Sequence, residues 1–328
     1  MKNNEKRPFR NDILVINDIE AECNRIVVNL KESVFHRLNR LGAVIGISGG
    51  IDSSVSMALV AKALGTENVL AIMLPEHDSS CDSELFAQKL ADKFGVKAIT
   101  ENITGALEGF GCYHRRDEAV KAVCPDYDPL NYKMKIGIRS SGLYTNLPPL
   151  FSLTIIDKNG IEQSKRVPAQ ELRQIEAASN FKQRCRMSML YYHAERLHYA
   201  VIGTPNKHEV EQGFFVKNGD GGADVMPIAH LYKTQVYQIA HYLGVPKEII
   251  NRTPTSDTYP AEQTQEEFFF QLPFHQMDLL WYAFKNEYEP EEVGSVMEKT
   301  AEEIKKVFAG FERKIKTTEY LRMSPISF

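Results

Sequence analysis

A glycine-rich segment between an apolar run and a helical pattern constrains the fold of this chain more than any other feature. The segment reads Gly46-Ile-Ser-Gly-Gly-Ile-Asp-Ser-Ser54. The apolar run at residues 42–48 has the length of a buried parallel strand, and residues 53–64 have a helical pattern that ends at Gly65. A strand that enters a helix through such a turn is typical of a parallel sheet covered by helices.

The same alternation of strands and helices recurs along the chain. Further apolar runs of strand length lie at residues 69–74 and 199–203, and residues 96–100 could form another strand. Helical patterns occupy residues 15–40, 83–95, 176–198 and 231–243. We therefore predict an α/β fold with a doubly wound parallel sheet, in which helices lie on both faces. We expect residues 1–328 to form one α/β domain.

The middle of the chain is less regular than the rest. Residues 125–170 contain several prolines and one hairpin signal, Asn159-Gly160. We interpret this stretch as a segment inserted in the middle of the fold, an excursion from the main sheet. Residues 286–328 are expected to form a mostly helical C-terminal part.

Composition and charge exclude several classes of protein. The 328 residues are 43% hydrophobic and 25% charged, which supplies a sizeable core and excludes a wholly disordered chain. The formal net charge is −4, so the chain has no overall positive charge that would indicate binding to nucleic acid. The sequence contains no run of about 18 apolar residues, so we expect no membrane span, and the charged N-terminus does not resemble a secretory signal. The five cysteines are scattered without a Cys-x-x-Cys pair, which indicates reduced thiols in a cytoplasmic protein.

The glycine-rich segment has the features of a phosphate-binding loop. Two adjacent glycines let the backbone turn tightly and approach a ligand, and successive N–H groups in such a turn bind anions. The helix that follows adds the positive end of its dipole. Asp52 would repel a phosphate, so its presence favours a Mg²⁺ ion between the carboxylate and the ligand. The structural alternative is a plain strand–turn–helix connection with serine and aspartate as caps.

The spacing within this loop excludes two common nucleotide-binding motifs. It lacks the lysine and the spacing of G-x-x-x-x-G-K-[ST], and it is not a Rossmann fingerprint. The loop resembles the PP-loop of the N-type ATP pyrophosphatases, which cleave ATP between the α and β phosphates and transfer AMP to a substrate oxygen. The loop alone leaves the substrate open among NAD synthases, GMP synthases, asparagine synthetases and tRNA-thiolating enzymes.

An ordered series of segments in the second half of the chain narrows that choice. The series comprises Asn180-Phe-Lys-Gln-Arg-Cys-Arg-Met187, Gly203-Thr-Pro-Asn-Lys-His-Glu209, Gly213-Phe-Phe-Val-Lys217, Gly219-Asp-Gly-Gly-Ala-Asp224, Leu231-Tyr-Lys-Thr-Gln-Val236 and Arg252-Thr-Pro-Thr-Ser-Asp257. Together with the loop, this series resembles the NAD synthases over residues 40–100 and 178–285. The resemblance implies the adenine nucleotide alpha hydrolase fold and a homodimer.

The resemblance also implies a reaction. In this family the carboxylate of nicotinic acid adenine dinucleotide attacks the α-phosphate of ATP and pyrophosphate leaves; ammonia then converts the acyl-adenylate into NAD and AMP. ATP is thus a co-substrate, and Mg²⁺ is the expected cofactor. About 40 residues precede the loop, too few for the glutaminase domain of glutamine-dependent members. We therefore expect the chain to use free ammonia or ammonia from a separate glutaminase partner.

Individual site residues follow from the resemblance by their position in these segments. The Mg²⁺ ligands would be Asp52 and Glu209, and the catalytic residues would be Asp52 and Lys233. The positions that match dinucleotide contacts are Arg184, Lys217 and Asp224. The ATP-binding set would be Gly46, Ile47, Ser48, Gly49, Gly50, Ile51, Asp52, Ser53, Thr204, Lys233 and Thr255.

Two positions differ from the usual pattern of the family. Gln265 stands where the family has an acidic residue. The stretch Thr318–Met323 lacks the His-Lys pair expected near the C-terminus, and Arg322 is the cation available there. Two alternative functions remain open. One is another PP-loop pyrophosphatase that amidates or thiolates a different substrate, and the other is a non-catalytic adenine-nucleotide-binding protein.

Overall fold

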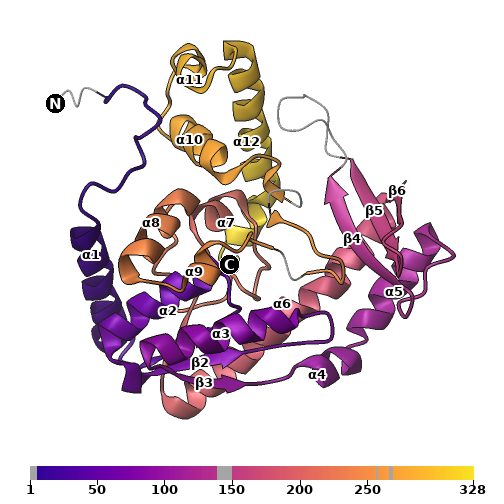
Figure 1. The fold of residues 1–328 in the computed structure, drawn as a ribbon, viewed down its shortest axis with the longest axis horizontal. Coiled ribbons are helices and arrows are strands. Elements are labelled where there is room, and N and C mark those ends of the chain that lie inside the picture. The colour runs from indigo at the N-terminus through magenta and orange to yellow at the C-terminus, as the bar shows by residue number, and fades with distance from the viewer. Residues whose placement is uncertain (1–5, 139–149, 256–257, 266–268) are drawn as a thin grey trace.

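The chain folds around a four-stranded parallel sheet with the strand order β3-β2-β1-β7 (Figure 1). The computed structural model describes residues 6–138, 150–255, 258–265 and 269–328. The strands of this sheet are β1 (Ala43–Gly46), β2 (Val69–Met73), β3 (Lys97–Thr100) and β7 (Ala200–Ile202). Each strand lies within one of the stretches in which a strand was predicted, so the predicted parallel sheet is confirmed.

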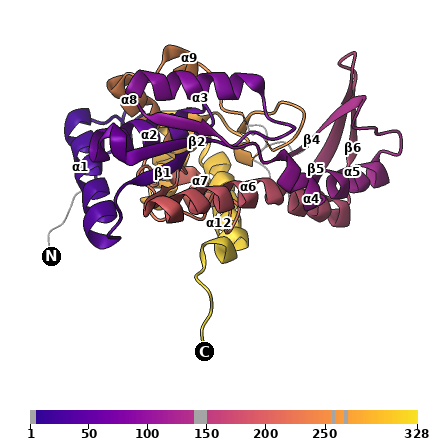
Figure 2. The same ribbon diagram turned by 90° about the horizontal axis from the view of Figure 1, so that it is seen from below.

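Helices cover both faces of this sheet, because successive strand residues point to opposite sides. Ala43 and Ile45 pack with four helices, which are α1 (Ile19–Lys31), α2 (Ile51–Leu64), α3 (Cys81–Phe94) and α8 (Lys233–Leu243). Val44 faces the other side, where it packs with α4 (Thr104–Gly109), α5 (Cys112–Val123) and α6 (Ala169–Leu197). Figure 2 shows α3 and α6 on opposite sides of the strands. The predicted doubly wound α/β class is confirmed.

Two predicted helices differ from the observed ones at their N-terminal ends. The helix predicted over residues 15–40 begins at Ile19, because the Asp18 side chain caps it by accepting a hydrogen bond from the Ala21 N–H. A π-helical turn, η1 (Glu32–Arg37), continues it. The helix predicted from residue 176 begins earlier, directly after Pro168, whose fixed φ suits a helix start. The remaining short elements are η2 (Thr66–Asn68), α7 (Lys207–Gln212) and α9 (Lys247–Ile250).

The excursion forms an antiparallel sheet of its own beside the main sheet (Figure 1). Its strands are β4 (Tyr132–Ile138), β5 (Phe151–Asp157) and β6 (Glu162–Arg166). The hairpin predicted at Asn159-Gly160 joins β5 to β6, and Gly160 adopts the positive φ of 80° that this turn requires. The apolar face of this sheet packs on α5 and α6.

The C-terminal part consists of three helices, α10 (Phe274–Lys285), α11 (Pro290–Met297) and α12 (Ala301–Arg322). They share an apolar core around the buried Trp281. The far end of α12 returns to α7, and a Cβ on Gly213 would lie 2.4 Å from the Thr318 Cβ. The C-terminal helices thus pack against α7 and α8, the two elements that follow β7. Within the described ranges, no helix combines the length and the apolar character needed to cross a membrane.

Candidate active site

A cavity of about 670 Å³ opens at the carboxyl ends of the central strands. Gly46 of β1, Met73 of β2 and Ile202 of β7 contribute to its wall. The chain passes from β1 to β2 on one side, whereas β7 pairs with β1 on the other side, so the strand order reverses at this point. Open α/β sheets bind ligands in the crevice at such a reversal.

The glycine-rich segment forms the turn from β1 into α2 and lines this cavity. Gly49 has a φ of 70°, and a Cβ there would lie 2.7 Å from the Ser83 carbonyl oxygen and 2.8 Å from the Phe86 Cβ. Both facts require glycine at this position. The serines fold the turn: Ser53 Oγ and Ser54 Oγ donate to the Gly50 carbonyl at 3.0 and 2.8 Å.

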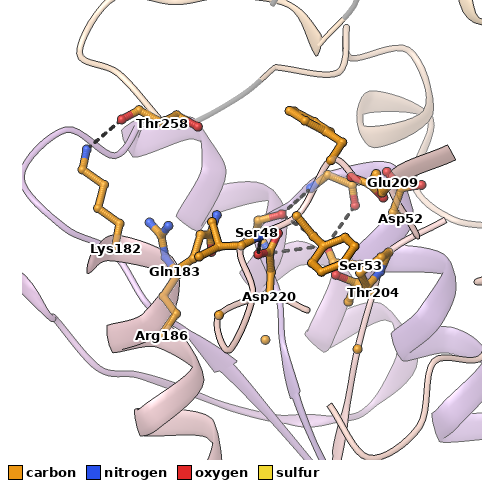
Figure 3. Close-up of a pocket in the computed structure, with 18 of the residues that line it drawn as sticks. Ser48, Asp52, Ser53, Lys182, Gln183, Arg186, Thr204, Glu209, Asp220 and Thr258 are labelled. Atoms are coloured by element: carbon orange, nitrogen blue, oxygen red, sulfur yellow. Dashed lines mark hydrogen bonds between the residues drawn. The ribbon is translucent and has the colours of Figure 1, made fainter. Parts of the chain in front are cut away.

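Two carboxylates and one lysine meet beside this loop (Figure 3 shows Asp52 and Glu209). The Lys233 ammonium forms an ion pair with one oxygen of Asp52. Asn206 Nδ2 donates to the other Asp52 oxygen at 3.1 Å, and the Asn206 N–H donates to Glu209 Oε2 at 2.8 Å. Asn206 therefore links the α2 carboxylate to the α7 carboxylate.

The charges in this cluster influence one another strongly. Burial raises the pKa of Glu209 to about 8, and the neighbouring Asp52 carboxylate adds to the shift. Burial alone would lower the pKa of Lys233, but the carboxylates of Asp52 and Glu209 outweigh it and raise that pKa. Lys233 is the first residue of α8, a helix end that ordinarily disfavours a cation. Its position is explained by the two carboxylates.

This cluster has the donor groups that a magnesium ion requires. Mg²⁺ is usually held by one or two carboxylates together with phosphate oxygens of a substrate. Asp52 and Glu209 supply two carboxylates next to a turn with the geometry of a phosphate-binding loop. Lys233 pairs with Asp52, and a cation bound between the two carboxylates would favour the ionised form of Glu209, whose pKa burial otherwise raises.

Most of the residues predicted for the site line the cavity. They are Gly46, Ile47, Ser48, Gly50, Ile51, Asp52, Ser53, Arg184, Thr204, Glu209, Lys217 and Thr255. Gly49 packs behind the loop against α3, and Lys233 is fully buried behind Asp52. Lys217 donates from its Nζ to the carbonyl oxygens of Tyr320 and Met323 at 2.8 and 2.9 Å, so it also caps the end of α12.

Asp224 lies apart from the other predicted residues. Its side chain is exposed and is absent from the described cavity lining. Asp224 Oδ2 accepts from the Val201 N–H at 2.8 Å, and Oδ1 accepts from the Tyr191 hydroxyl at 3.1 Å. These bonds hold the segment after the Gly219–Ala223 loop against β7. The dinucleotide-binding role of Asp224 stays a prediction.

The two positions that differ from the family pattern have different surroundings. Gln265 lines the cavity near Thr255. Arg322 points back along its own helix, where it donates to Thr318 Oγ1 and to the Ile315 carbonyl oxygen at 3.0 and 2.9 Å. The cavity wall near the end of α12 is formed by Thr317, Thr318, Tyr320 and Leu321.

Sequence reasoning missed several polar residues of this site. Arg186 and Arg252 line the cavity, and they donate to the Leu74 carbonyl oxygen and to Ser83 Oγ, respectively. No spacing rule shows which face of a long helix or loop meets a cavity. Asn206 could have been predicted, because Asn-x-x-Glu is the sequence pattern of a capping box. Asn206 and Glu209 form such a box at the start of α7.

Comparison with known proteins identifies the family. The sequence profile described as NAD synthase matches residues 22–131 and 152–325. An NH(3)-dependent NAD(+) synthetase of Rhizobium meliloti (strain 1021) is 46% identical over 317 residues, covering 97% of this chain and 94% of the relative.

Two solved structures share the fold at a TM-score of 0.62. NMN synthetase from Francisella tularensis is 22% identical over 94% of this chain and 98% of its own, and NH3-dependent NAD synthetase from Campylobacter jejuni is 19% identical over 95% and 100%. With its loop, carboxylate pair and lysine at the edge of the parallel sheet, the chain belongs to the NAD synthase family.

Proposed function

We propose that this chain is an ammonia-dependent NAD synthase. It would amidate nicotinic acid adenine dinucleotide at the expense of ATP and release AMP and pyrophosphate. The observation that carries the proposal is the cluster of Asp52, Glu209 and Lys233 beside a phosphate-type loop, in a chain nearly half identical to a relative named for this activity. The loss of pyrophosphate from ATP is favoured by nearby positive charge, which Lys233 and a Mg²⁺ ion held by the two carboxylates would supply.

The glycine-rich loop would bind the phosphates of ATP. Its backbone N–H groups and the N-terminal end of α2 present positive partial charge to the cavity. Thr204 and Thr255 line the same cavity and would contact the nucleotide. Lys233 would supply positive charge close to the leaving pyrophosphate, since its ammonium group stays charged beside Asp52.

Asp52 and Glu209 would hold Mg²⁺. The ion would supply charge that offsets the negative charge of the leaving pyrophosphate. Asn206 orients both carboxylates, because it donates to an oxygen of each. The ion pair with Lys233 fixes the orientation of the Asp52 carboxylate beside the cavity.

The dinucleotide would bind across the part of the cavity formed by α6 and α12. Arg184 and Lys217 line this part and would contact its phosphates, with Asp224 as a third predicted contact. We also propose a homodimer, and free ammonia or a separate glutaminase as the nitrogen source. The relative from Rhizobium meliloti is named for ammonia, which supports the first source.

An end-point assay tests this proposal. The protein is incubated with nicotinic acid adenine dinucleotide, ATP and Mg²⁺, with either ammonium or glutamine, and NAD, AMP and pyrophosphate are separated by chromatography. Equal amounts of NAD and AMP with ammonium alone are expected. Pyrophosphate release with another carboxylate substrate would favour a different PP-loop enzyme, and ATP binding without turnover would favour a non-catalytic binder.

A further inference from the structure

A chain of hydrogen bonds runs through the buried contact between α7, α8, α10 and α12. Lys314 Nζ donates to Gln212 Oε1 at 3.3 Å, and Gln212 Nε2 bonds His208 Nδ1 at 2.9 Å. His208 Nε2 bonds Asp278 Oδ1 at 2.5 Å, and Asp278 Oδ2 accepts from the Thr234 N–H at 2.7 Å. Gln212, His208 and Asp278 are each 0% exposed.

The donors and acceptors along this chain of hydrogen bonds can be assigned in only one way. The Met277 sulfur can only accept, and it lies 3.4 Å from Gln212 Nε2, so the NH₂ group of Gln212 faces Met277 and His208 while its carbonyl oxygen accepts from Lys314. Nδ1 of His208 must then accept, which leaves the ring proton on Nε2. The Asp278 carboxylate accepts from both sides, from His208 Nε2–H and from the Thr234 N–H. Asp278 is the only member of the chain that accepts without donating.

The chain meets the proposed site at two places. His208 immediately precedes Glu209 on α7, and Thr234 immediately follows Lys233 on α8. The N–H groups of a first helical turn have no partner within the helix, and Asp278 supplies one for Thr234 from another helix. The same carboxylate places a negative charge at the helix end that begins with Lys233. Asp278 therefore holds the elements that carry both charged residues.

We propose that Asp278 and His208 are positioning residues for the site. Through this chain of hydrogen bonds they hold α8 against α7. They thereby set the position of Lys233 relative to Asp52 and Glu209. This inference rests on the proposed function, in which Lys233 and Glu209 act on ATP. Displacement of either group by a fraction of an ångström lowers the rate of the reaction more than it weakens binding of a remote substrate.

The tautomer of His208 tests the chain without any activity measurement. Nitrogen-15 NMR of the histidine rings, assigned by comparison with a His208→Gln variant, should show the ring proton of His208 on Nε2 and Nδ1 as an acceptor. In Asp278→Asn one amide N–H must face either His208 or the Thr234 N–H, so a proton on Nδ1 or a broadened mixture is expected. A proton on Nδ1 or a doubly protonated ring in the wild type would overturn the proposal.

Steady-state kinetics test the positioning role. Asp278→Asn should lower kcat by on the order of 10- to 100-fold, because a buried donor is left facing a donor next to Lys233. The KM for nicotinic acid adenine dinucleotide should change by less than about threefold, because the chain lies away from the proposed dinucleotide contacts. Asp278→Glu, which keeps the carboxylate, should recover part of the loss. A wild-type kcat in folded Asp278→Asn would refute the role.

A matched control separates positioning from general stability. Trp281 lies on the same helix as Asp278 and donates from Nε1 to Glu211 Oε2 of α7 at 2.6 Å. Trp281→Phe removes another hydrogen bond between α10 and α7 that lies outside the chain, so it should lower the melting temperature and leave kcat within about threefold. An equal loss of kcat in both variants would show that Asp278 only stabilises the fold and would refute its positioning role.

The same set of variants distinguishes this inference from the proposed function. If the wild type makes no NAD, the proposed function fails, and the affinity for ATP with Mg²⁺ is measured by calorimetry instead. Asp278→Asn should then bind ATP with Mg²⁺ at least about tenfold more weakly than Trp281→Phe does. Equal affinities in the two variants would reject the positioning role independently of the substrate.

Discussion

Lys233 and Asp52 form an ion pair at the edge of the central sheet although 181 positions separate them in the sequence. The lysine is fully buried, and Asp52 is 15% exposed at the cavity. The pair brings the first turn of α8 to the glycine-rich loop and thereby sets the charge of the site. Glu209 lies near enough for both groups to influence its pKa.

Loss of either carboxylate should remove catalysis while the fold survives. Asp52→Asn and Glu209→Gln keep the size of each side chain but remove the charge that would bind Mg²⁺. Each should lower the rate of AMP formation by about 100-fold or more, measured with saturating ATP and ammonium. Glu248→Gln removes an exposed carboxylate of α9 and serves as the control, with unchanged activity expected. Turnover at the wild-type rate in Asp52→Asn would contradict the assignment of the site.

Substitution of the lysine should reveal whether it and the metal share the same carboxylates. Lys233→Met leaves Asp52 and Glu209 without their cation, and breaking a buried pair in this way costs about 3–5 kcal/mol of unfolding free energy. The melting temperature should therefore fall, and millimolar Mg²⁺ without ATP should restore more of it than in the wild type. Equal Mg²⁺-induced shifts in both proteins would show that the ion binds elsewhere.

The glycine-rich loop should tolerate no side chain at Gly49. Gly49→Ala places a Cβ 2.7 Å from the Ser83 carbonyl oxygen in a left-handed conformation, at a cost of about 2 kcal/mol or more. Chemical denaturation should show this loss, and ATP binding should weaken with it. Gly105→Ala in α4 is the matched control, since no atom lies within 4 Å of its added Cβ. Its stability should rise slightly, because alanine favours the helix.

Lys314 should make the stability of the protein depend on pH in the alkaline range. Burial lowers the pKa of Lys314 to about 7 from its usual value near 10.5. Between these two values the unfolded chain binds a proton that the folded chain does not, so stability rises with pH across this window. Lys314→Met should remove that slope and raise the melting temperature by about a few degrees at pH 6, and by less at pH 10. Lys316→Met, on the exposed face of α12, should leave the slope unchanged, and a parallel shift at both pH values would contradict the assignment.

Local sequence patterns were sufficient for the sheet and for the phosphate-type loop. The strands β1, β2 and β7 lie within uninterrupted apolar runs, because a strand that helices cover on both faces carries apolar side chains on both sides. The edge strand β3 is partly exposed and includes Lys97 and Thr100. The turn at Gly49 and the hairpin at Gly160 could also be predicted from the sequence, because a backbone with a positive φ favours glycine at that position. These features depend on residues that are close in the chain.

The candidate site could be predicted only in part. Asp52 and Glu209 follow from motifs next to strand ends, and parallel strands bring such ends to one edge of the sheet. Arg186 and Arg252 were missed because helix phase and loop path decide which side chains meet the cavity. Lys217 turned out to cap α12 as well as to line the cavity, a contact between segments more than a hundred positions apart.

The sequence by itself determined the parallel α/β sheet, the loop that enters α2 and the family of the chain, since each depends on short-range patterns of apolar residues, glycines and motif spacing. The tertiary structure alone decided that Lys233 pairs with Asp52, that Asn206 joins both carboxylates, and that Asp278 and His208 lie behind them. Such contacts form only when separate helices pack, because buried polar groups must find partners wherever the fold brings them.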